Sequence, residues 1–313
     1  MTNFIAQRMA FGEALFELAQ QNRRILCLDG DLATSTRADI LADQLPESFL
    51  EMGIAEQNLF GVAAGLATLG FIPFISTLAC FTKRALDQIR IVIAQPRTNV
   101  KFTGAYSGLL TGKTGKTHQA VEDIAVFRAM PNMVTIVPAD GIEVKQAMRA
   151  MAEYDGPVYL RLTRDPCPVV TDGLAPFVMG RARVLRLGRD IALIGTGEMS
   201  TRSLQAAEML AQEGIHAHVL HVPTIKPLDE DAIVEAAMRT GRVLTVEDHS
   251  IIGGLGSAVA EVLGERHPTR LKRLGWCDTY GESAPNEPLL EKYGLAPRHI
   301  AQAARRLLSA PVD

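Results

Sequence analysis

Glu56 is the residue whose type and placement most clearly suit chemistry. It stands where an extended segment, residues 51–55, turns into a segment rich in glycine, alanine and leucine at 59–69. Small side chains let neighbouring backbones approach closely, so we expect a helix there that is buried on most of its faces. A carboxylate that enters a buried helix must accept hydrogen bonds or take up a proton itself. Glu56 is therefore a candidate acid–base group, although a carboxylate at such a position can also serve only as a helix cap.

A second candidate, His118, lies in the run Gly-Lys-Thr-His-Gln at 115–119, shortly before Glu-Asp-Ile-Ala at 122–125. An imidazole can donate or accept a proton near neutral pH, which suits it to acid–base work. A lone histidine at the start of a helix is more often a surface or capping residue. The residue type alone therefore leaves both roles open.

The same loop contains Gly-Lys-Thr-Gly-Lys-Thr at 112–117, which looks like a nucleotide-binding P-loop at first sight. That motif needs a glycine five positions before its Gly-Lys-Thr, and the residue there is Leu110. No predicted strand runs directly into the loop either. The sequence therefore argues against an ATPase.

The elements that would position these groups are alternating apolar strands and amphipathic helices. In the first half we expect strands at 25–28, 71–76, 100–103, 134–137 and 158–162, and helices at 8–21, 80–94, from 122, and at 141–153. In the second half, strands at 191–195, 219–222 and 243–246 alternate with helices at 201–213, 229–239 and one that opens at 253–256. The strands are short continuous apolar runs, as expected when helices cover both faces of a parallel sheet. This alternation predicts an α/β protein with two doubly wound, mainly parallel-sheet domains.

A stretch without periodicity separates the two halves. Residues 165–180 are rich in proline and glycine, which indicates a linker. We therefore expect one domain at 1–166, a linker at 167–186 and a second domain at 187–313. Glycine-rich turns at 195–197 and 253–256 could cradle a phosphate at a helix start, but neither completes the dinucleotide fingerprint. Close turn packing is the favoured interpretation of both.

Composition argues against several classes of function. The 313 residues are 47% hydrophobic and 21% charged, and the formal net charge is -3. This balance argues against a nucleic-acid partner or a membrane surface, and no apolar run reaches the length of a membrane span. Cys27, Cys80, Cys167 and Cys277 are scattered, as in a protein whose thiols stay reduced. The first residues also lack the features of a secretory signal, so we expect a cytoplasmic protein.

The runs around Glu56 and His118 resemble the transketolase family, and the resemblance covers essentially the whole chain. It implies that the first half is a domain that binds the pyrimidine of thiamine diphosphate and the second half a transketolase C-terminal domain. In the family, the residue that matches Glu56 contacts the aminopyrimidine, and the one that matches His118 lies beside the reacting centre. Phe81 matches an aromatic residue that stacks on the pyrimidine. Leu78 and Arg84 stand where transketolases carry further aromatic residues of this pocket.

The resemblance also implies a place for the anionic end of a sugar substrate. Arg164, in Leu-Thr-Arg-Asp at 162–165, matches an arginine that holds a terminal phosphate. Ser35 and Arg8 match other contacts at that end, and His118 would hydrogen-bond substrate oxygens. Two further cations in the loop, Lys113 and Lys116, would add positive charge there, although lysines in an exposed loop can also simply be solvated.

Some positions depart from the family pattern or lack an implied role. Where full-length transketolases carry an aspartate and a phosphate-binding histidine, this chain has Thr114 and Tyr106. This difference suggests a donor or acceptor sugar other than a common ketose phosphate. In the second half, His249 stands in Glu-Asp-His-Ser at 247–250, and we interpret it as structural.

One motif is missing. Thiamine diphosphate enzymes hold the diphosphate through a metal bound by Gly-Asp-Gly and a downstream asparagine, and such a metal needs hard oxygen ligands. No Gly-Asp-Gly occurs here, and the string at 29–31 has the reverse order, Asp-Gly-Asp. The chain therefore resembles the small subunit of a split transketolase and should itself hold no metal. An N-terminal partner subunit would carry Gly-Asp-Gly…Asn and bind Mg²⁺ or Ca²⁺, in an α2β2 assembly or around a β2 core.

The activity implied is transfer of a two-carbon ketol unit from a ketose or its phosphate to an aldose or its phosphate, with thiamine diphosphate as cofactor. It would require the partner subunit. The alternatives are the β subunit of a 2-oxo acid dehydrogenase, a fragment of a 1-deoxyxylulose-5-phosphate synthase, and a non-catalytic scaffold subunit. The Thr-His pair at 117–118 and Lys-Pro-Leu-Asp at 226–229 favour a transketolase over the dehydrogenase. The sequence leaves the sugars open.

Overall fold

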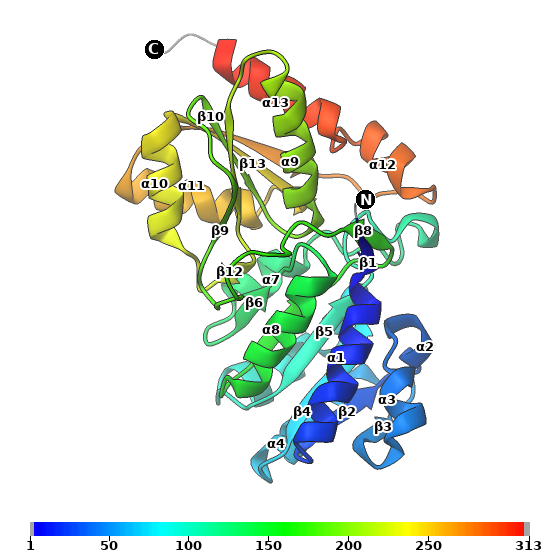
Figure 1. The fold of residues 1–313 in the computed structure, drawn as a ribbon. Helices are drawn as coiled ribbons and strands as arrows, with labels where there is room; N and C mark the ends of the chain where they lie inside the picture. Colours follow the sequence, from blue (N-terminus) through cyan, green and yellow to red (C-terminus); the bar gives the residue numbers. More distant parts are fainter. Residues whose placement is uncertain (1–2, 310–313) are drawn as a thin grey trace.

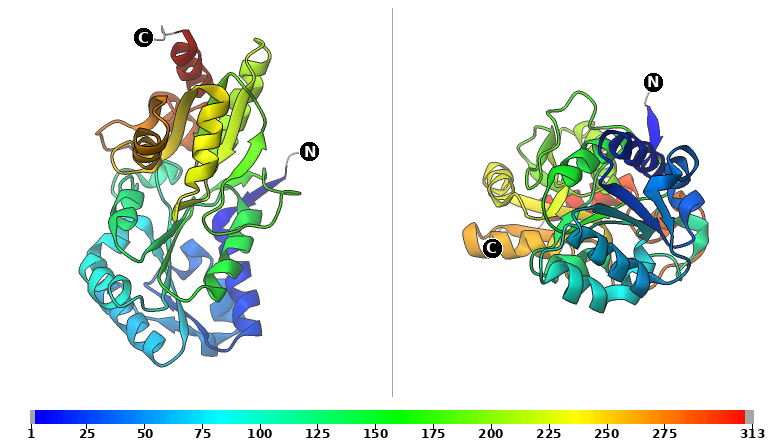
Figure 2. Two further views of the ribbon diagram at one scale, coloured as in Figure 1. Left: turned by 90° about the vertical axis from the view of Figure 1, so that its left-hand side faces the viewer. Right: turned by 90° about the horizontal axis from the view of Figure 1, so that it is seen from below.

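Two α/β units, each built around its own sheet, make up the chain in a computed structural model that describes residues 3–309 (Figure 1). Figure 2 shows the unit of the first half below and that of the second half above, with helices on the outside. Both sheets are mainly parallel, so the predicted fold class is confirmed. Within residues 3–309, no helix has the length and apolar character needed to cross a membrane.

The first sheet has seven strands in the order β12-β6-β7-β5-β4-β2-β3. Neighbouring strands are parallel except β12, which runs antiparallel to β6 at one edge. Its central strands are continuously buried, because helices cover both faces. The strands are β2 (Ile25–Asp29), β3 (Phe49–Glu51), β4 (Ile72–Leu78), β5 (Lys101–Ala105), β6 (Val134–Ile136), β7 (Val158–Arg161) and β12 (Thr224–Lys226).

Helices cover the two faces of this sheet with separate apolar cores. On one face, α1 (Gln7–Gln21) and α8 (Gly141–Glu153) pack against each other and on the strands (Figure 1). The other face is covered by α4 (Glu56–Thr68) and α7 (Asp123–Ala129). Two short helices, α2 (Ala33–Thr36) and α3 (Asp39–Gln44), follow β2. The predicted helices at 8–21, 141–153 and from 122 are thus confirmed.

The single helix predicted at 80–94 is instead a series of short pieces. These are α5 (Ala79–Thr82), a 3₁₀ turn (Lys83–Ala85), α6 (Leu86–Gln88) and a π-helical segment (Ile89–Ala94). The fully buried residues Ala85, Ile89 and Ile93 recur every four residues, a spacing slightly longer than one α-helical turn. A wider π turn helps to keep such residues on one face, and such turns are frequent at functional sites.

The second sheet has five strands in the order β14-β13-β10-β11-β9, with only β9 antiparallel to its neighbour. Helices α9 and α13 cover one face, and α10 and α11 cover the other. The strands are β9 (Arg183–Arg186), β10 (Ile191–Gly195), β11 (Ala217–His221), β13 (Arg242–Ser250) and β14 (Arg270–Trp276). The helices are α9 (Glu198–Ala211), α10 (Glu230–Thr240), α11 (Leu255–Arg266), α12 (Asn286–Lys292) and α13 (Pro297–Ser309).

The connection between the units is more ordered than an aperiodic linker. Within 167–186, β9 joins the second sheet, and β8 (Pro166–Pro168) pairs with β1 (Phe4–Ala6) near the N-terminus. In the opposite direction, β12 from the second half of the chain closes the edge of the first sheet. The chain therefore crosses between the units more than once. The outermost ends of both predicted domains, residues 1–2 and 310–313, lie outside the described residues.

A buried polar cluster, here called the interdomain seam, joins the units around Glu143 of α8. One carboxylate oxygen accepts from Arg183 Nη1 at 2.6 Å. The other accepts from the Ala139 N–H and lies 2.7 Å from His221 Nε2. The other ring nitrogen of His221 is 2.6 Å from Ser200 Oγ. Glu143 and His221 are fully buried, and their side-chain polar atoms all have partners in this chain of contacts.

A second set of contacts holds the units together beside α7. The Arg161 guanidinium donates to the Asp123 carboxylate at 2.8 Å and to the backbone oxygen of Asp248 at 2.8 Å. The Asp248 carboxylate accepts from the Leu109 N–H at 2.9 Å and from Trp276 Nε1 at 3.2 Å. The loop after β5 is therefore anchored in the second unit, which fixes the strand ends that carry the predicted site.

Candidate functional site

Part of the candidate site lies where the parallel strands of the first sheet end. Asp29 is the last residue of β2, Leu78 the last residue of β4, and Tyr106 directly follows β5. The carboxyl ends of strands are the edge at which open α/β sheets bind ligands. The groups there form two sets. We call them the carboxylate end (Glu56, Phe81, Arg84 and His118) and the arginine end (Arg8, Ser35, Tyr106 and Arg164).

Glu56 is the first residue of α4, and its side chain is 4% exposed. Its Oε2 atom is buried and has no hydrogen-bond partner within the described residues. The guanidinium Nε of Arg84 lies 3.4 Å from Oε2, but 63% of the Arg84 side chain is exposed. The helix therefore begins with a buried carboxylate that still has an unused acceptor position. The position at the N-terminus of α4 favours its negative charge.

Phe81 and His118, the two rings that we assign to the carboxylate end, contact each other. The centroids of the Phe81 and His118 rings are 5.5 Å apart, and the rings meet edge to face. His118 is half-buried and follows a tight turn in which its N–H donates to the Gly115 oxygen at 3.0 Å. Its Nδ1 atom is 2.9 Å from Thr117 Oγ1. The histidine is thus oriented by its loop, and its ring faces the Phe81 ring.

The arginine end is organised around Tyr106. Arg8 Nη1 donates to the phenol oxygen of Tyr106 at 3.2 Å and to the backbone oxygen of Ser35 at 3.1 Å. The Arg8 guanidinium carbon lies 6.0 Å from the Tyr106 ring centroid, and that of Arg164 lies 5.3 Å from it. Arg164 also contacts the Asp165 carboxylate at 3.3 Å. Two guanidinium groups therefore meet at one buried phenol, and the Asp165 carboxylate contacts one of them.

Tyr106 lies between Arg8 and Arg164 of the candidate site, although the sequence suggested it only as a departure from a pattern. It is 6% exposed and has a positive φ of 55°, which is unusual for a residue with a side chain. It also packs in one apolar cluster with Leu78 and Ala105, against which Phe81 lies. Leu78 is therefore in the wall that joins the two ends of the site. The role of Tyr106 could not be inferred from its residue type, because it depends on the course of the loop that follows β5.

Lys113 and Lys116 lie apart from this arrangement. Both side chains are exposed, on the loop that leads to His118. The loop is held by the second unit, since Ser283 Oγ donates to the Lys113 backbone oxygen at 2.6 Å and Gln119 Nε2 to the Glu282 oxygen at 3.1 Å. Within residues 3–309, neither lysine side chain has a hydrogen bond or ion pair with the arginine end.

Asp29 is a further acidic group at the same edge, and residue pattern did not select it for the site. It is fully buried, and its Oδ1 accepts from the Leu32 N–H at 2.6 Å, while Oδ2 has no partner within the described residues. Burial raises the pKa of the Asp29 carboxyl to about 6, and the hydrogen bond from Leu32 opposes this rise. Only the string Asp-Gly-Asp pointed to this position.

His249 and the glycine-rich turn after it have partners of their own. His249 is fully buried, and its Nε2 accepts from the Ala125 N–H at 3.3 Å while Nδ1 faces the Ser250 oxygen. At the start of α11, the N–H groups of Leu255 and Gly256 donate to the Glu247 carboxylate at 2.7 and 2.8 Å. The Glu247 carboxyl group already accepts hydrogen bonds from the N–H groups of this helix start, which supports close packing over phosphate binding.

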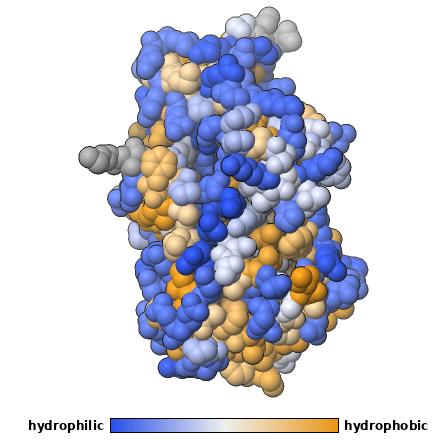
Figure 3. Space-filling model, turned by 90° about the vertical axis from the view of Figure 1, so that its right-hand side faces the viewer, coloured by the Kyte–Doolittle hydropathy of each residue, from blue (hydrophilic) through white to orange (hydrophobic). Residues whose placement is uncertain are grey.

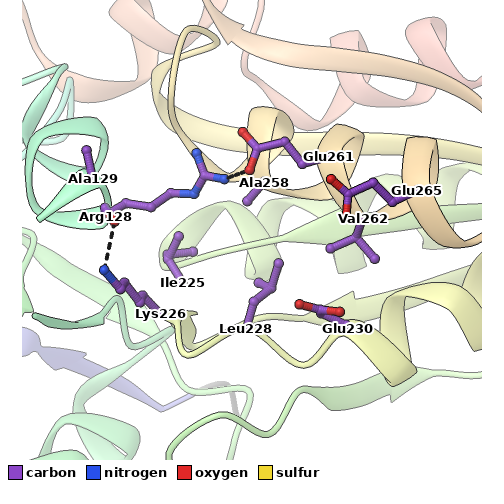
Figure 4. A pocket seen from close by; sticks show the side chains of 10 residues that line it. All are labelled: Arg128, Ala129, Ile225, Lys226, Leu228, Glu230, Ala258, Glu261, Val262 and Glu265. Carbon is purple, nitrogen blue, oxygen red and sulfur yellow. Dashed lines mark hydrogen bonds and ion pairs between the residues drawn. The ribbon is translucent and has the colours of Figure 1, made fainter. Parts of the chain in front are cut away.

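A separate cavity of about 450 Å³ lies between the units (Figure 4). Arg128 and Lys226 line it together with the acidic residues Glu230, Glu261 and Glu265, and no predicted site residue takes part. Arg128 is ion-paired with Glu261, and Lys226 donates to the backbone oxygen of Arg128 (Figure 4). In the part of the chain that the structure describes, no group of three or more His, Cys, Asp or Glu side chains is placed to hold a metal ion.

Two family descriptions match this chain, one in each half. Residues 4–168 match "Transketolase, pyrimidine binding domain", and residues 180–300 match "Transketolase, C-terminal domain". The chain is 40% identical over 301 residues to the 6-deoxy-6-sulfo-D-fructose transketolase subunit SqwH of Clostridium sp. (strain MSTE9), covering 96% of this chain and 94% of the relative.

Two further similarities concern separate subunits of the same kind. The chain is 38% identical over 304 residues to an apulose-4-phosphate transketolase subunit of Phocaeicola vulgatus, covering 96% of this chain and 97% of the relative. Among solved structures, it is similar to a split gene transketolase described as an inactive beta4 tetramer. That match has a TM-score of 0.89 and 45% identity, and covers 98% of this chain and 99% of the other. All three similarities extend over nearly the full length of both chains.

Proposed function

The chain belongs to the transketolase family, as a subunit of a transferase of that type, and we propose that its carboxylate end binds and activates the aminopyrimidine of thiamine diphosphate. The observation that carries this proposal is the buried Oε2 of Glu56, which has an unused acceptor position within the described residues. A carboxylate in that state can accept a hydrogen bond from a heteroaromatic ring nitrogen that carries a proton.

The neighbouring groups fit a planar ring beside this carboxylate. Phe81 offers an aromatic surface near the site, and Leu78 is a buried apolar residue in the adjoining wall. Aromatic and apolar side chains with a few placed polar groups are what a cofactor pocket needs. Thiamine diphosphate, when bound, would supply the electron sink for breaking and making a carbon–carbon bond. Glu56 would hold the proton at the pyrimidine nitrogen, and Phe81 would fix the orientation of the ring.

His118 would act on the substrate side. Its imidazole lies beside Phe81, at the carboxylate end, and is only half-buried, so a sugar hydroxyl or carbonyl oxygen could reach it. There it would donate a hydrogen bond to an oxygen that gains negative charge during the reaction, or transfer a proton. The reaction is transfer of a two-carbon ketol unit from a ketose to an aldose.

The arginine end would hold the anionic terminus of the sugar. Arg8 and Arg164 meet at Tyr106, while Asp165 is the one carboxylate in contact with Arg164 among the described residues. Guanidinium groups bind phosphate and similar oxyanions through parallel N–H donors. This supports a phosphorylated or sulfonated sugar, two classes that the names of the relatives above include. Ser35 would contribute through the backbone that Arg8 already contacts. The loop lysines, Lys113 and Lys116, would contribute at most long-range attraction.

A partner subunit would complete the site. The chain has no Gly-Asp-Gly sequence, so the Mg²⁺ or Ca²⁺ that holds the diphosphate would be bound by the partner. Leu50 and Ile54, which precede Glu56, expose 37% and 67% of their surface. Figure 3 shows that apolar surface gathers over the lower unit, whereas the upper unit is mostly hydrophilic on this face. Exposed apolar residues beside an incomplete site support docking of a partner. The assembly would be an α2β2 complex or one built around a β2 core, in the cytoplasm.

Reconstitution tests this function. The purified chain is mixed with the subunit that carries Gly-Asp-Gly…Asn, thiamine diphosphate and Mg²⁺, and a panel of phosphorylated, sulfonated and neutral ketoses is supplied with an aldose acceptor. Two-carbon transfer should appear only in the mixture. Turnover by the chain alone would contradict the requirement for a partner, and release of carbon dioxide from a 2-oxo acid would point to the dehydrogenase instead.

A further inference from the structure

Arg84 contacts Glu56 in a way that the proposed chemistry does not call for. Its Nε lies 3.4 Å from Oε2, yet no hydrogen bond joins them, and Oε2 has no hydrogen-bond partner within the described residues. The two side chains also differ sharply in environment, since 63% of Arg84 is exposed but only 4% of Glu56. The guanidinium therefore balances the charge of the carboxylate without satisfying its hydrogen-bonding capacity.

A buried carboxylate needs such a balancing cation while no ligand is present. Burial without a partner makes an ionised carboxylate costly, and the N-terminus of α4 offsets only part of that cost. Glu56 has one ion-pair partner among residues 3–309, namely Arg84. Arg84 therefore supplies the Glu56 carboxylate with a counter-cation that reaches in from the surface.

The pairing is chemically similar to the one that the cofactor would make. A guanidinium is a planar, delocalised cation, and an aminopyrimidine that shares a proton with Glu56 is also planar and positively charged. We infer that Arg84 is a placeholder: it serves as the counter-cation of Glu56 in the free subunit, and the pyrimidine displaces it when thiamine diphosphate binds. This inference rests on the proposed function for the identity of the incoming ring.

Two reasons lead us to expect that the bound pyrimidine displaces Arg84 from Glu56: electrostatic repulsion and the position of Arg84. If the guanidinium stayed beside Glu56, its positive charge would oppose protonation of the adjacent ring nitrogen. Arg84 lies in the 3₁₀ turn between two short helices, and most of its side chain already faces solvent. Ion pairs with one largely exposed partner contribute little, so moving Arg84 outward costs little. Glu56, in contrast, is fixed at the start of α4.

The first part of the test uses the isolated full-length chain and needs no cofactor. Melting midpoints are compared for wild type, Arg84→Gln, Glu56→Gln and the double variant. If Arg84 balances the Glu56 charge, Arg84→Gln should lower the midpoint by about 2 °C or more in the wild-type background. It should have a clearly smaller effect when Glu56 is already glutamine. Arg90→Gln is the matched control, because Arg90 is an exposed cation on the same stretch of chain.

The second part measures thiamine diphosphate affinity of the assembled complex by equilibrium dialysis with Mg²⁺. Removing the placeholder removes a competitor, so Arg84→Gln should bind the cofactor about three- to tenfold more tightly than wild type. Arg90→Gln should bind as wild type does. The gain should shrink at high salt, where the ion pair is screened.

The melting midpoints and the cofactor affinities together test whether Arg84 is a placeholder. Coupling between Arg84 and Glu56 together with tighter binding by Arg84→Gln supports the placeholder. Absence of coupling refutes it, and coupling with weaker binding shows instead that Arg84 holds the bound cofactor. If the wild-type complex and the variants all fail to bind thiamine diphosphate while the coupling persists, the proposed function is wrong. The displacement of Arg84 by the pyrimidine is then wrong as well.

Discussion

Glu56 and Glu143 are both buried glutamates in the first turns of helices on the first sheet, but their surroundings are opposite. Glu143, in the interdomain seam, has both carboxylate oxygens engaged by Arg183, His221 and the Ala139 N–H. Glu56 has a single cation nearby and an oxygen without a hydrogen bond among the described residues. A completed network holds two units in one arrangement, whereas an incomplete one leaves capacity for a ligand. Burial alone therefore does not separate structural from functional carboxylates; the state of their acceptor positions does.

The largest expected effect is on stability and comes from Glu143, whose carboxylate oxygens both have partners. Glu143→Ala should lower the free energy of unfolding by about 3–5 kcal/mol, because it leaves the charges of the interdomain seam buried without a partner. Denaturant unfolding at neutral pH measures this loss. Glu153→Ala, an exposed site on the same helix, should change stability by less than about 0.5 kcal/mol. A small effect at both positions would mean that the seam does not hold the units together.

The next effect should fall on activity rather than on stability. Glu56→Gln keeps the size of the side chain but cannot accept the ring proton, so turnover of the reconstituted enzyme should fall by about 10²-fold or more. Its unfolding free energy should stay within about 1 kcal/mol of wild type, since no complete network is broken. Steady-state turnover and denaturant unfolding of the same preparations give both values. Near-normal turnover would show that Glu56 is only a helix cap.

At the other end of the site, Arg164→Ala should act on substrate affinity. We expect KM for a ketose with a terminal phosphate or sulfonate to rise by about tenfold or more, because one of two guanidinium groups is lost. KM for a neutral analogue should change little. Arg181→Ala removes an exposed cation elsewhere and serves as the control. Equal losses with charged and neutral sugars would show that Arg164 does not recognise the anion.

Most of this fold is predictable from the sequence because the pattern is local. Continuous apolar runs indicate the central strands, and β4, β5, β7 and β10 begin close to the expected positions. What could not be predicted depends on distant partners. β12 joins the first sheet from the second half of the chain, and no local pattern in Thr224–Lys226 indicates that sheet. The series of short helical pieces at 80–94 could not be predicted either, because it depends on which of these residues are buried against the sheet.

For the site, too, residues in local sequence runs could be predicted, whereas contacts between distant residues could not. Glu56, Phe81 and His118 stand in recognisable runs, and the structure brings the last two within ring contact. That Arg84 faces Glu56 was not predicted, because the ion pair joins residues of two different elements. The seam was missed for the same reason: His221 and Glu143 are separated by 78 residues in sequence. The type of a residue suggests what chemistry its side chain can do. Its contacts determine whether the polar atoms of that side chain are already occupied.

A smaller effect should appear in the pH dependence of stability. Burial by itself would raise the pKa of the Glu143 carboxyl, but the charge of His221 and hydrogen bonds from the seam hold it below the ordinary 4.5. A carboxyl with a lowered pKa stabilises the folded state above its unfolded pKa, and this contribution is lost as pH falls through the folded pKa. The stability difference between wild type and Glu143→Gln should therefore be greatest near neutral pH and shrink below about pH 4.5. A difference that stays constant on acidification would contradict this assignment.

The smallest effect should come from the loop lysines. They allow a comparison between the arginines that contact Tyr106 and charges that are only near the site. Lys113 and Lys116 are exposed, and the backbone of Lys113 is engaged by Ser283. Exposed charges beyond contact distance are largely screened at physiological salt, so the double Lys→Ala variant should change KM for an anionic sugar by less than about threefold. At low salt the change should grow, since the lysines then add to the attraction of an anion toward the site. A tenfold rise in KM at physiological salt would mean instead that the loop moves when substrate binds and carries a lysine onto the anion. The arginine end would then be only part of the anion site, and its half-buried guanidinium groups would act together with the exposed lysines.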